Sequence, residues 1–136
     1  MDPFPLPSSE FLDNAAAMVA IFGQVNLYDA DLRAVRLLLA AVPMTEVDLY
    51  LPGAFALATG EEPHPSEYRI TFACHGVTSV HAEEIHSQNI VGEYGFESAA
   101  ITSARRLWIR GIVGCNLEVH CTRIAIAEVA PVVTAP

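Results

Sequence analysis

Alternation between apolar and polar residues constrains the fold of this chain more than any other feature of its sequence. Several short segments switch character at every residue, which is the period of a strand with one face on a core. The connections between them are too short to hold crossover helices, so the pattern predicts antiparallel pairing. The predicted strands lie at residues 46–51, 68–75, 77–82, 90–98, 106–110, 115–121 and around Ile124 and Ile126, before Pro131.

One helix is predicted ahead of these strands. Ser8 or Ser9 can cap it, and Gly23 is placed to end it. Apolar residues recur between these points at helical spacing, which indicates a helix with one face on the sheet. They are Phe11, Leu12, Ala15, Met18, Val19 and Phe22.

The stretch from Asp29 to Val42 fits two structures. Asp29 can cap a helix whose apolar residues stack every third or fourth position, and the same residues also fit a long strand. In a strand, Arg33 and Arg36 would fall on opposite faces under strict alternation. The strand therefore requires a β-bulge between these two arginines.

These elements together predict an α+β fold in which an N-terminal helix packs on a mainly antiparallel β-sheet meander. With 136 residues the chain has a common length for one domain. We expect residues 1–136 to form a single domain with an ordered core at about 8–130. The proline-rich start and the C-terminal tail are expected to be flexible.

The charge of the chain restricts its partners. Sixteen acidic residues oppose seven arginines, no lysine occurs, and the net charge is −9. An acidic surface repels phosphates, so the sequence predicts no nucleic-acid binding, and the missing lysine rules out Schiff-base chemistry. A basic protein is the complementary partner, although the charge can also serve solubility alone. The apolar fraction of 52% leaves room for contact with a further chain, including a homo-oligomer.

The location and the thiol state are predicted from two further observations. No basic signal segment and no apolar run of membrane-spanning length occurs, so we expect a cytoplasmic protein without membrane contact. Cys74, Cys115 and Cys121 are an odd number, which favours free thiols over a disulfide framework. Each falls on the apolar face of its strand, so we expect all three thiols to be buried.

Two groups of metal-ligand residues do not have the spacing of a metal site. His81 and His86 are five residues apart, whereas a zinc helix needs two histidines four apart on one face. Alternation places His75 and His120 on polar faces, away from the neighbouring cysteines. We therefore predict no metal, no cofactor and no catalytic residue, and the sequence contains no enzyme motif.

Trp108 is the strongest candidate for a binding residue. Alternation places it with Arg106 and Arg110 on the polar face of one strand, and Trp and Arg are enriched in binding hot spots. Glu93 and Glu97 would supply acidic groups around this aromatic anchor. The alternative is an indole that is only covered by the arginine stems or by the helix.

Three short motif pairs resemble immunity protein 50, a family of small immunity proteins from bacterial polymorphic toxin systems. Phe22-Gly23 and residues 27–30 (Leu-Tyr-Asp-Ala) resemble its opening, with Tyr28 where the family usually has His. Gly76-Val77 and residues 88–90 (Gln-Asn-Ile) resemble its centre, and residues 120–131 resemble its closing strand. The resemblance implies a helix followed by an antiparallel sheet, with the Asp29 stretch as a strand. It also implies a protein that blocks a toxin by binding it, without catalysis.

The sequence therefore predicts an immunity-like protein that neutralises a basic protein partner by covering its surface. Two other functions fit the sequence. The apolar fraction suits a structural or adaptor subunit of a larger assembly, and a small enzyme without a recognisable motif is the third possibility.

Overall fold

The structure is a computed structural model that describes residues 6–57, 65–98 and 104–132. It contains one short α-helix, one 3-10 turn and nine strands within these residues. Their bounds are β1 (Leu12–Asp13), α1 (Ala16–Phe22), β2 (Asp31–Leu38), β3 (Met44–Pro52), η1 (Gly53–Phe55), β4 (Glu67–His75), β5 (Ser79–Glu83), β6 (Ile90–Ser98), β7 (Arg105–Val113), β8 (Asn116–Cys121) and β9 (Arg123–Val132). The predicted flexibility of both chain ends concerns segments that include residues 1–5 and 133–136, which lie outside the described residues.

The predicted fold class is confirmed: the protein is α+β with an N-terminal helix and a mostly antiparallel, open sheet. The strand order is β1-β9-β4-β3-β2-β6-β7-β8-β5. Strands β2, β3 and β4 form one meander, and β6, β7 and β8 form a second. Two strands leave this sequential order, because β5 pairs with β8 and β9 pairs with β4. One pair, β1 with β9, is parallel.

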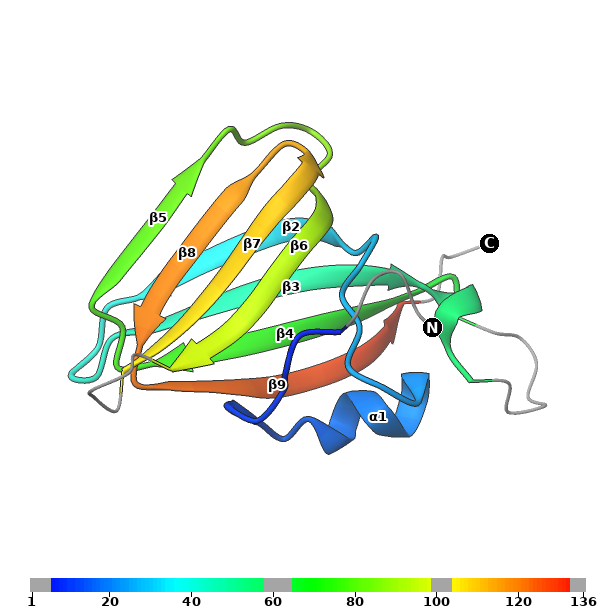
Figure 1. The fold of residues 1–136 in the computed structure, drawn as a ribbon, viewed down its shortest axis with the longest axis horizontal. Helices are drawn as coiled ribbons and strands as arrows, with labels where there is room; N and C mark the ends of the chain where they lie inside the picture. Colours follow the sequence, from blue (N-terminus) through cyan, green and yellow to red (C-terminus); the bar gives the residue numbers. More distant parts are fainter. Residues whose placement is uncertain (1–5, 58–64, 99–103, 133–136) are drawn as a thin grey trace.

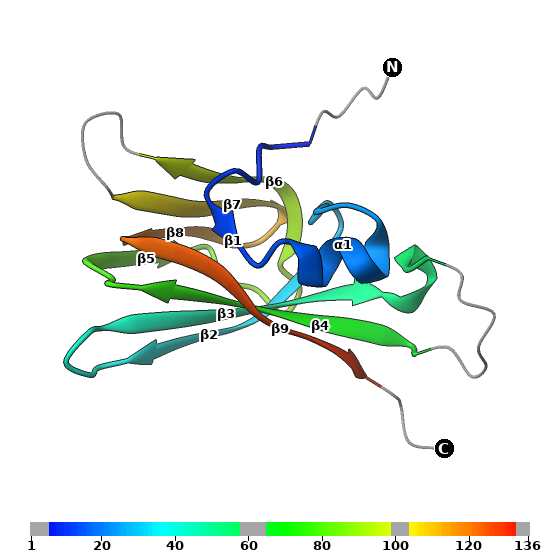
Figure 2. The same ribbon diagram turned by 90° about the horizontal axis from the view of Figure 1, so that it is seen from below.

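The sheet folds into two layers that face each other (Figure 1). We call strands β2, β3, β4 and β9 the β2 layer, and strands β5, β8, β7 and β6 the β6 layer. Figure 2 shows the two layers one above the other, with α1 beside the gap between them. Alternate residues of both layers point into one shared core, where Phe72 and Phe96 stack with ring centroids 5.7 Å apart. The period-two pattern predicted that each strand has one buried face. Burial of these faces in the shared core is the main source of the protein's stability.

The layers meet at one pair of residues, Asp31 of β2 and Ile90 of β6. Asn89 holds this junction, because its side-chain amide donates to the carbonyl oxygens of Leu32 and His86, and its Oδ1 accepts from the backbone N–H groups of His86 and Cys115. A single side chain thus ties β2 to the loop before β6 and to the β7–β8 turn.

The chain crosses between the layers again after β4. Gly76 has φ +66°, a left-handed conformation that favours glycine. Thr122 lies directly against it, and both its backbone N–H and its hydroxyl donate to the His75 carbonyl oxygen. The β4–β5 crossing and the β8–β9 crossing therefore lie side by side.

The helix is shorter than predicted. It begins at Ala16, and the proposed caps Ser8 and Ser9 lie outside it. Leu12 and the residue after it form β1 instead, paired with β9. Asn14 then adopts a left-handed conformation with φ 62°, which prevents a continuous helix from residue 9. The predicted end is confirmed, since the Gly23 N–H donates to the Val19 carbonyl oxygen at 2.8 Å.

The ambiguous Asp29 stretch is a strand, as the resemblance implied, and it covers Asp31–Leu38. A β-bulge is present, but it lies at Arg33, between Leu32 and Ala34, and not between Arg33 and Arg36 as predicted. The extra residue lets Arg33 and Arg36 project from the same outer face. The last predicted strand is longer than expected, because β9 continues through Pro131 to Val132.

Candidate functional site

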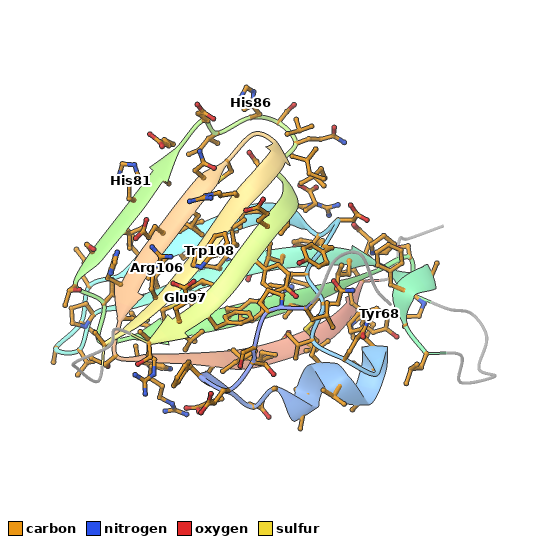
Figure 3. The ribbon with its side chains drawn as sticks, viewed as in Figure 1. Tyr68, His81, His86, Glu97, Arg106 and Trp108 are labelled. Carbon is orange, nitrogen blue, oxygen red and sulfur yellow. The ribbon has the colours of Figure 1, made fainter. Side chains whose placement is uncertain are left out.

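The five predicted binding residues share the outer face of β6 and β7. The register pairs Glu93 with Arg110, Gly95 with Trp108, and Glu97 with Arg106. Because side chains alternate across a strand, all the named polar residues point away from the core. Figure 3 shows Glu97, Arg106 and Trp108 gathered on this face. The structure thus brings together every residue that the sequence proposed for this site.

Trp108 lies flat against the sheet. Its partner across the ladder is Gly95, and a Cβ atom on that glycine would lie 2.4 Å from the indole Nε1. The indole therefore occupies the space that any larger residue would fill. Its Nε1 donates a hydrogen bond to Glu97 Oε1 at 2.9 Å. The side chain as a whole is intermediate in exposure, so part of it is accessible at the surface.

Two arginines flank the indole from opposite ends. The guanidinium carbons of Arg106 and Arg110 lie 5.8 and 5.3 Å from the ring centroid, within cation–π range. Arg106 forms ion pairs with Glu97 at 2.7 Å and with Glu118 at 3.3 Å, and Arg110 lies 3.8 Å from Glu93. The positive charges beside Trp108 are therefore balanced by carboxylates of the same surface.

Strand β8 adds polar residues that the sequence analysis did not include in this site. Trp108 pairs across the β7–β8 ladder with Glu118, whose Oε1 lies 2.7 Å from His120 Nε2. The pKa of Glu118 is lowered by that hydrogen bond and by Arg106, so its carboxylate stays ionised. The alternation of β8 already showed that these residues point outward. Only the pairing of β7 with β8, which alternation does not reveal, puts them beside Trp108.

A shallow groove runs over this surface between β5 and β7. Its volume is about 320 Å³. Acidic and basic side chains line it, together with Trp108: they include His81, Glu83, Arg106, Arg110 and Glu118. We call the outer face formed by these residues, with Glu93 and Glu97, the Trp108 surface. Its aromatic centre and charged border resemble the layout of a protein-binding patch.

The cysteines lie inside the protein, as predicted. Cys74, Cys115 and Cys121 are buried and unpaired by disulfides. The pKa of the Cys74 thiol is raised by its hydrogen bond to Cys121 and by burial, and burial raises the pKa of Cys115. The same hydrogen bond lowers the pKa of its partner Cys121, and burial opposes that shift.

His81 and His86 come from different parts of the β5 region, and both are labelled in Figure 3. His81 is exposed on β5, and His86 lies in the exposed loop before β6. Across residues 6–57, 65–98 and 104–132, no three His, Cys, Asp or Glu side chains are close enough to hold a metal ion. The absence of tightly bound zinc stays a prediction, which elemental analysis of the purified protein can test.

Comparison of the chain with protein-family models, with curated proteins and with solved structures finds no match. In the described part of the chain, no helix has the length and apolarity of a membrane span.

The motifs that resemble the immunity family occupy structural positions. Residues 27–30 and 88–90 lie side by side at the junction of the two layers, where Asp29 N–H donates to the Val91 carbonyl oxygen and Val91 N–H to the Ala30 carbonyl oxygen. Gly76-Val77 and residues 120–122 meet at the second crossing. Tyr28 packs edge-on against Tyr94 at 5.2 Å. These residues therefore support the folded shape, and none of them belongs to the Trp108 surface, although His120 contacts Glu118 of that surface.

Proposed function

We propose that this protein is an immunity-like binding module that neutralises a basic protein toxin by covering part of the toxin's surface with the Trp108 surface. One observation carries the proposal: Trp108 is only partly buried, and it is held flat against the sheet by Gly95 beneath it and Glu97 beside it. An aromatic residue that is fixed before binding loses little conformational entropy when a partner covers it.

The surrounding charges suit such a contact. The carboxylates of Glu93, Glu97 and Glu118 border the indole, and the whole chain carries a net charge of −9. Opposite charge on a partner would raise the association rate and orient the encounter. Fixed ion pairs to Arg106 and Arg110 keep these carboxylates in place, so the surface presents a constant charge pattern.

The assignment to immunity rests on the sequence resemblance, and the Trp108 surface supports the binding role. Occlusion requires no catalytic group, so the proposal gives none of these residues a chemical step. It also implies that toxin and immunity protein are made in the same compartment, consistent with the predicted cytoplasmic location.

Co-expression tests this proposal. The chain should restore growth to cells that produce a basic toxin domain encoded beside its gene, and the purified pair should form a stable complex. Trp108→Ala should weaken both effects, whereas Phe55→Ala, which removes an aromatic side chain that is 49% exposed on η1, should not. Failure of every neighbouring gene product to bind the wild-type chain would contradict the immunity assignment. Equal weakening by both variants would exclude the Trp108 surface.

A further inference from the structure

A cavity of about 300 Å³ opens beside the C-terminal end of α1. It lies between the end of this helix, the loop that follows it, the end of β3 and η1. Figures 1 and 2 show η1 beside the end of α1, and the Leu57 N–H donates to the Ile21 carbonyl oxygen at 2.8 Å between these two segments. None of the described residues that line the cavity belongs to the Trp108 surface.

Three aromatic side chains line this cavity. Phe22 is the last residue of α1, Tyr28 lies in the loop after the helix, and Phe55 belongs to η1. The first two rings are fixed from behind, because Phe22 packs edge-on against Tyr68 and Tyr28 packs edge-on against Tyr94, with centroids 5.4 and 5.2 Å apart. The faces of aromatic rings attract cations within about 6 Å of the ring centroid.

Asp29 supplies the charge of the cavity. Among the described lining residues it is the one ionised side chain, none of the seven arginines lines the cavity, and the chain has no lysine. No ion pair of the described residues includes its carboxylate. Its backbone is held in place, because its N–H donates to the Val91 carbonyl oxygen at 3.1 Å. The cavity thus combines an unbalanced negative charge with three aromatic rings, and both features attract a cation.

The lining favours an alkylated ammonium group over a primary one. A primary ammonium has three N–H donors and is strongly hydrated, so it needs acceptors when it leaves water. Asn26 lines the cavity, but its Oδ1 already accepts from the Tyr28 N–H at 3.0 Å, and Phe22, Leu51 and Phe55 offer no side-chain acceptor. A fully methylated ammonium has no N–H to satisfy, and it spreads its charge over methyl groups that aromatic and aliphatic side chains can contact.

We infer that this cavity binds a small organic cation with a fully alkylated ammonium group, of the size of choline. Phe22, Tyr28 and Phe55 contact its methyl groups, and the Asp29 carboxylate balances its charge. The volume lies at the low end of the range for ligand sites, which restricts the ligand to a small molecule. Because the cavity and the Trp108 surface share no described residue, cation binding and toxin binding are separate properties.

Calorimetric titration of the wild-type chain with choline chloride tests the inference, with sodium chloride as the salt control. The matched neutral ligand is 3,3-dimethylbutan-1-ol, in which a carbon replaces the nitrogen of choline, and it should bind at least about tenfold more weakly. Ammonium chloride should also bind more weakly than choline. A chain that does not bind choline, or that binds the neutral alcohol or ammonium equally well, overturns the inference. A trimethyl-lysine peptide that binds more tightly than choline would overturn the assignment to a small molecule.

Two variants locate the binding. Asp29→Asn removes the charge and keeps a residue that tolerates the φ of 67° at this position, and it should weaken choline binding at least about tenfold. Phe55→Ala removes a ring that is 49% exposed, so it should keep the fold and also weaken choline binding. The matched control is Glu84→Gln, which neutralises a carboxylate at another left-handed position, with φ 56°, outside the described lining of the cavity.

The comparison of these variants decides the inference. Glu84→Gln should bind choline as the wild type does, and thermal unfolding of each variant checks that the fold is kept. If Glu84→Gln weakens choline binding as much as Asp29→Asn, the cation responds only to the net charge of −9, and the site is excluded. Choline binding that both Asp29→Asn and Phe55→Ala leave intact overturns the inference as well. Trp108→Ala should bind choline normally whatever its effect on a toxin, which separates this inference from the proposed function.

Discussion

Glu97 accepts a hydrogen bond from Trp108 Nε1 through one carboxylate oxygen and forms an ion pair with Arg106 through the other. One side chain of β6 thus fixes both the indole and the guanidinium beside it. The orientation of Trp108 therefore depends on a residue whose charge is also expected to attract a basic partner. A change at Glu97 therefore acts on the anchor and on the charge together, whereas Trp108→Ala removes the anchor and leaves the carboxylate.

Truncation of the indole should shorten the lifetime of the complex. For Trp108→Ala we expect a loss of about 2 kcal/mol in binding, roughly a thirtyfold faster dissociation, because buried aromatic anchors are typical hot spots. Association should change little. Measurement of both rates with the purified partner decides this, and an unchanged dissociation rate would remove Trp108 from the interface.

Neutralisation of the two β6 carboxylates should act on association instead. The double change Glu93→Gln and Glu97→Gln keeps the size of both side chains and removes two charges. At low salt it should slow association, and the difference should shrink as salt screens the charges over about 8–10 Å. An association rate that is unaffected at low salt would show that these carboxylates do not guide the partner.

Gly95→Ala should displace the indole without removing it. The new Cβ would approach Nε1 to 2.4 Å, so the ring must move and its bond to Glu97 must lengthen or break. Trp108 is the one tryptophan of the chain, so its fluorescence reports this site alone. We expect an emission shift with the fold retained, and an unaltered spectrum would contradict the observed packing of the indole on Gly95.

The sequence predicted the strands of this fold well because alternation is a local property. For the strand alternative of the Asp29 stretch it required a bulge between Arg33 and Arg36, and the register shift lies at Arg33 itself, between Leu32 and Ala34. The start of the helix was predicted wrongly, because the left-handed Asn14 and the pairing of β1 with β9 depend on residues more than a hundred positions away.

At the candidate site, too, the sequence predicted local features and missed those that depend on pairing between strands. Alternation placed Trp108, Arg106 and Arg110 outward, and the structure confirms it. It did not indicate that Glu118 lies across the ladder from Trp108, because register between strands depends on turns and tertiary packing. Nor did it indicate that the chain crosses between two layers at Gly76, which requires long-range contact with Thr122.

That crossing can be tested by substitution. Gly76→Ala should destabilise the protein by about 1–3 kcal/mol, because the residue has φ +66° and its new Cβ would meet Thr122 Oγ1 at 2.3 Å. Thr122→Ala in the same chain should relieve the steric part and leave the backbone strain. Denaturant unfolding of both single variants and the double variant measures the coupling, and purely additive losses would contradict a direct contact.

The thiols should be silent in the native protein. Cys74, Cys115 and Cys121 are all buried, so a thiol reagent should react only as fast as the protein opens. All three should react at once after denaturation without reductant. Fewer than three equivalents would reveal a disulfide, and rapid native reaction would show that the core is more open than the structure indicates.

The last prediction concerns Asp48, a 5% exposed carboxylate on the outer face of β3. Two hydrogen bonds from Arg36 lower its pKa, burial opposes this shift, and a bond from the Thr71 hydroxyl at 2.8 Å adds to the lowering. Its folded pKa therefore lies below its unfolded value, which is about 3.9 for an unperturbed Asp. The resulting stabilisation is fully present above that unfolded pKa and is lost as pH falls through the folded pKa.

We therefore expect the free energy of unfolding to fall below about pH 4 in the wild type, and to fall less in Asp48→Asn, which has no charge to lose. At neutral pH the same variant should already be less stable, on the order of 2 kcal/mol, because it leaves Arg36 without its main partner. Glu128→Gln is the control: its carboxylate pairs with Arg69 on the same face but is 54% exposed, so its removal should cost no more than about 1 kcal/mol. Glu118 also has a lowered pKa, so the wild-type curve contains more than one carboxylate, and the difference between wild type and Asp48→Asn isolates the contribution of Asp48. Denaturant unfolding from pH 7 to pH 3 measures that difference. If it stays constant with pH, the Arg36–Asp48 pair contributes through packing and hydrogen bonding alone, and its charge plays no part in the stability of the β2 layer.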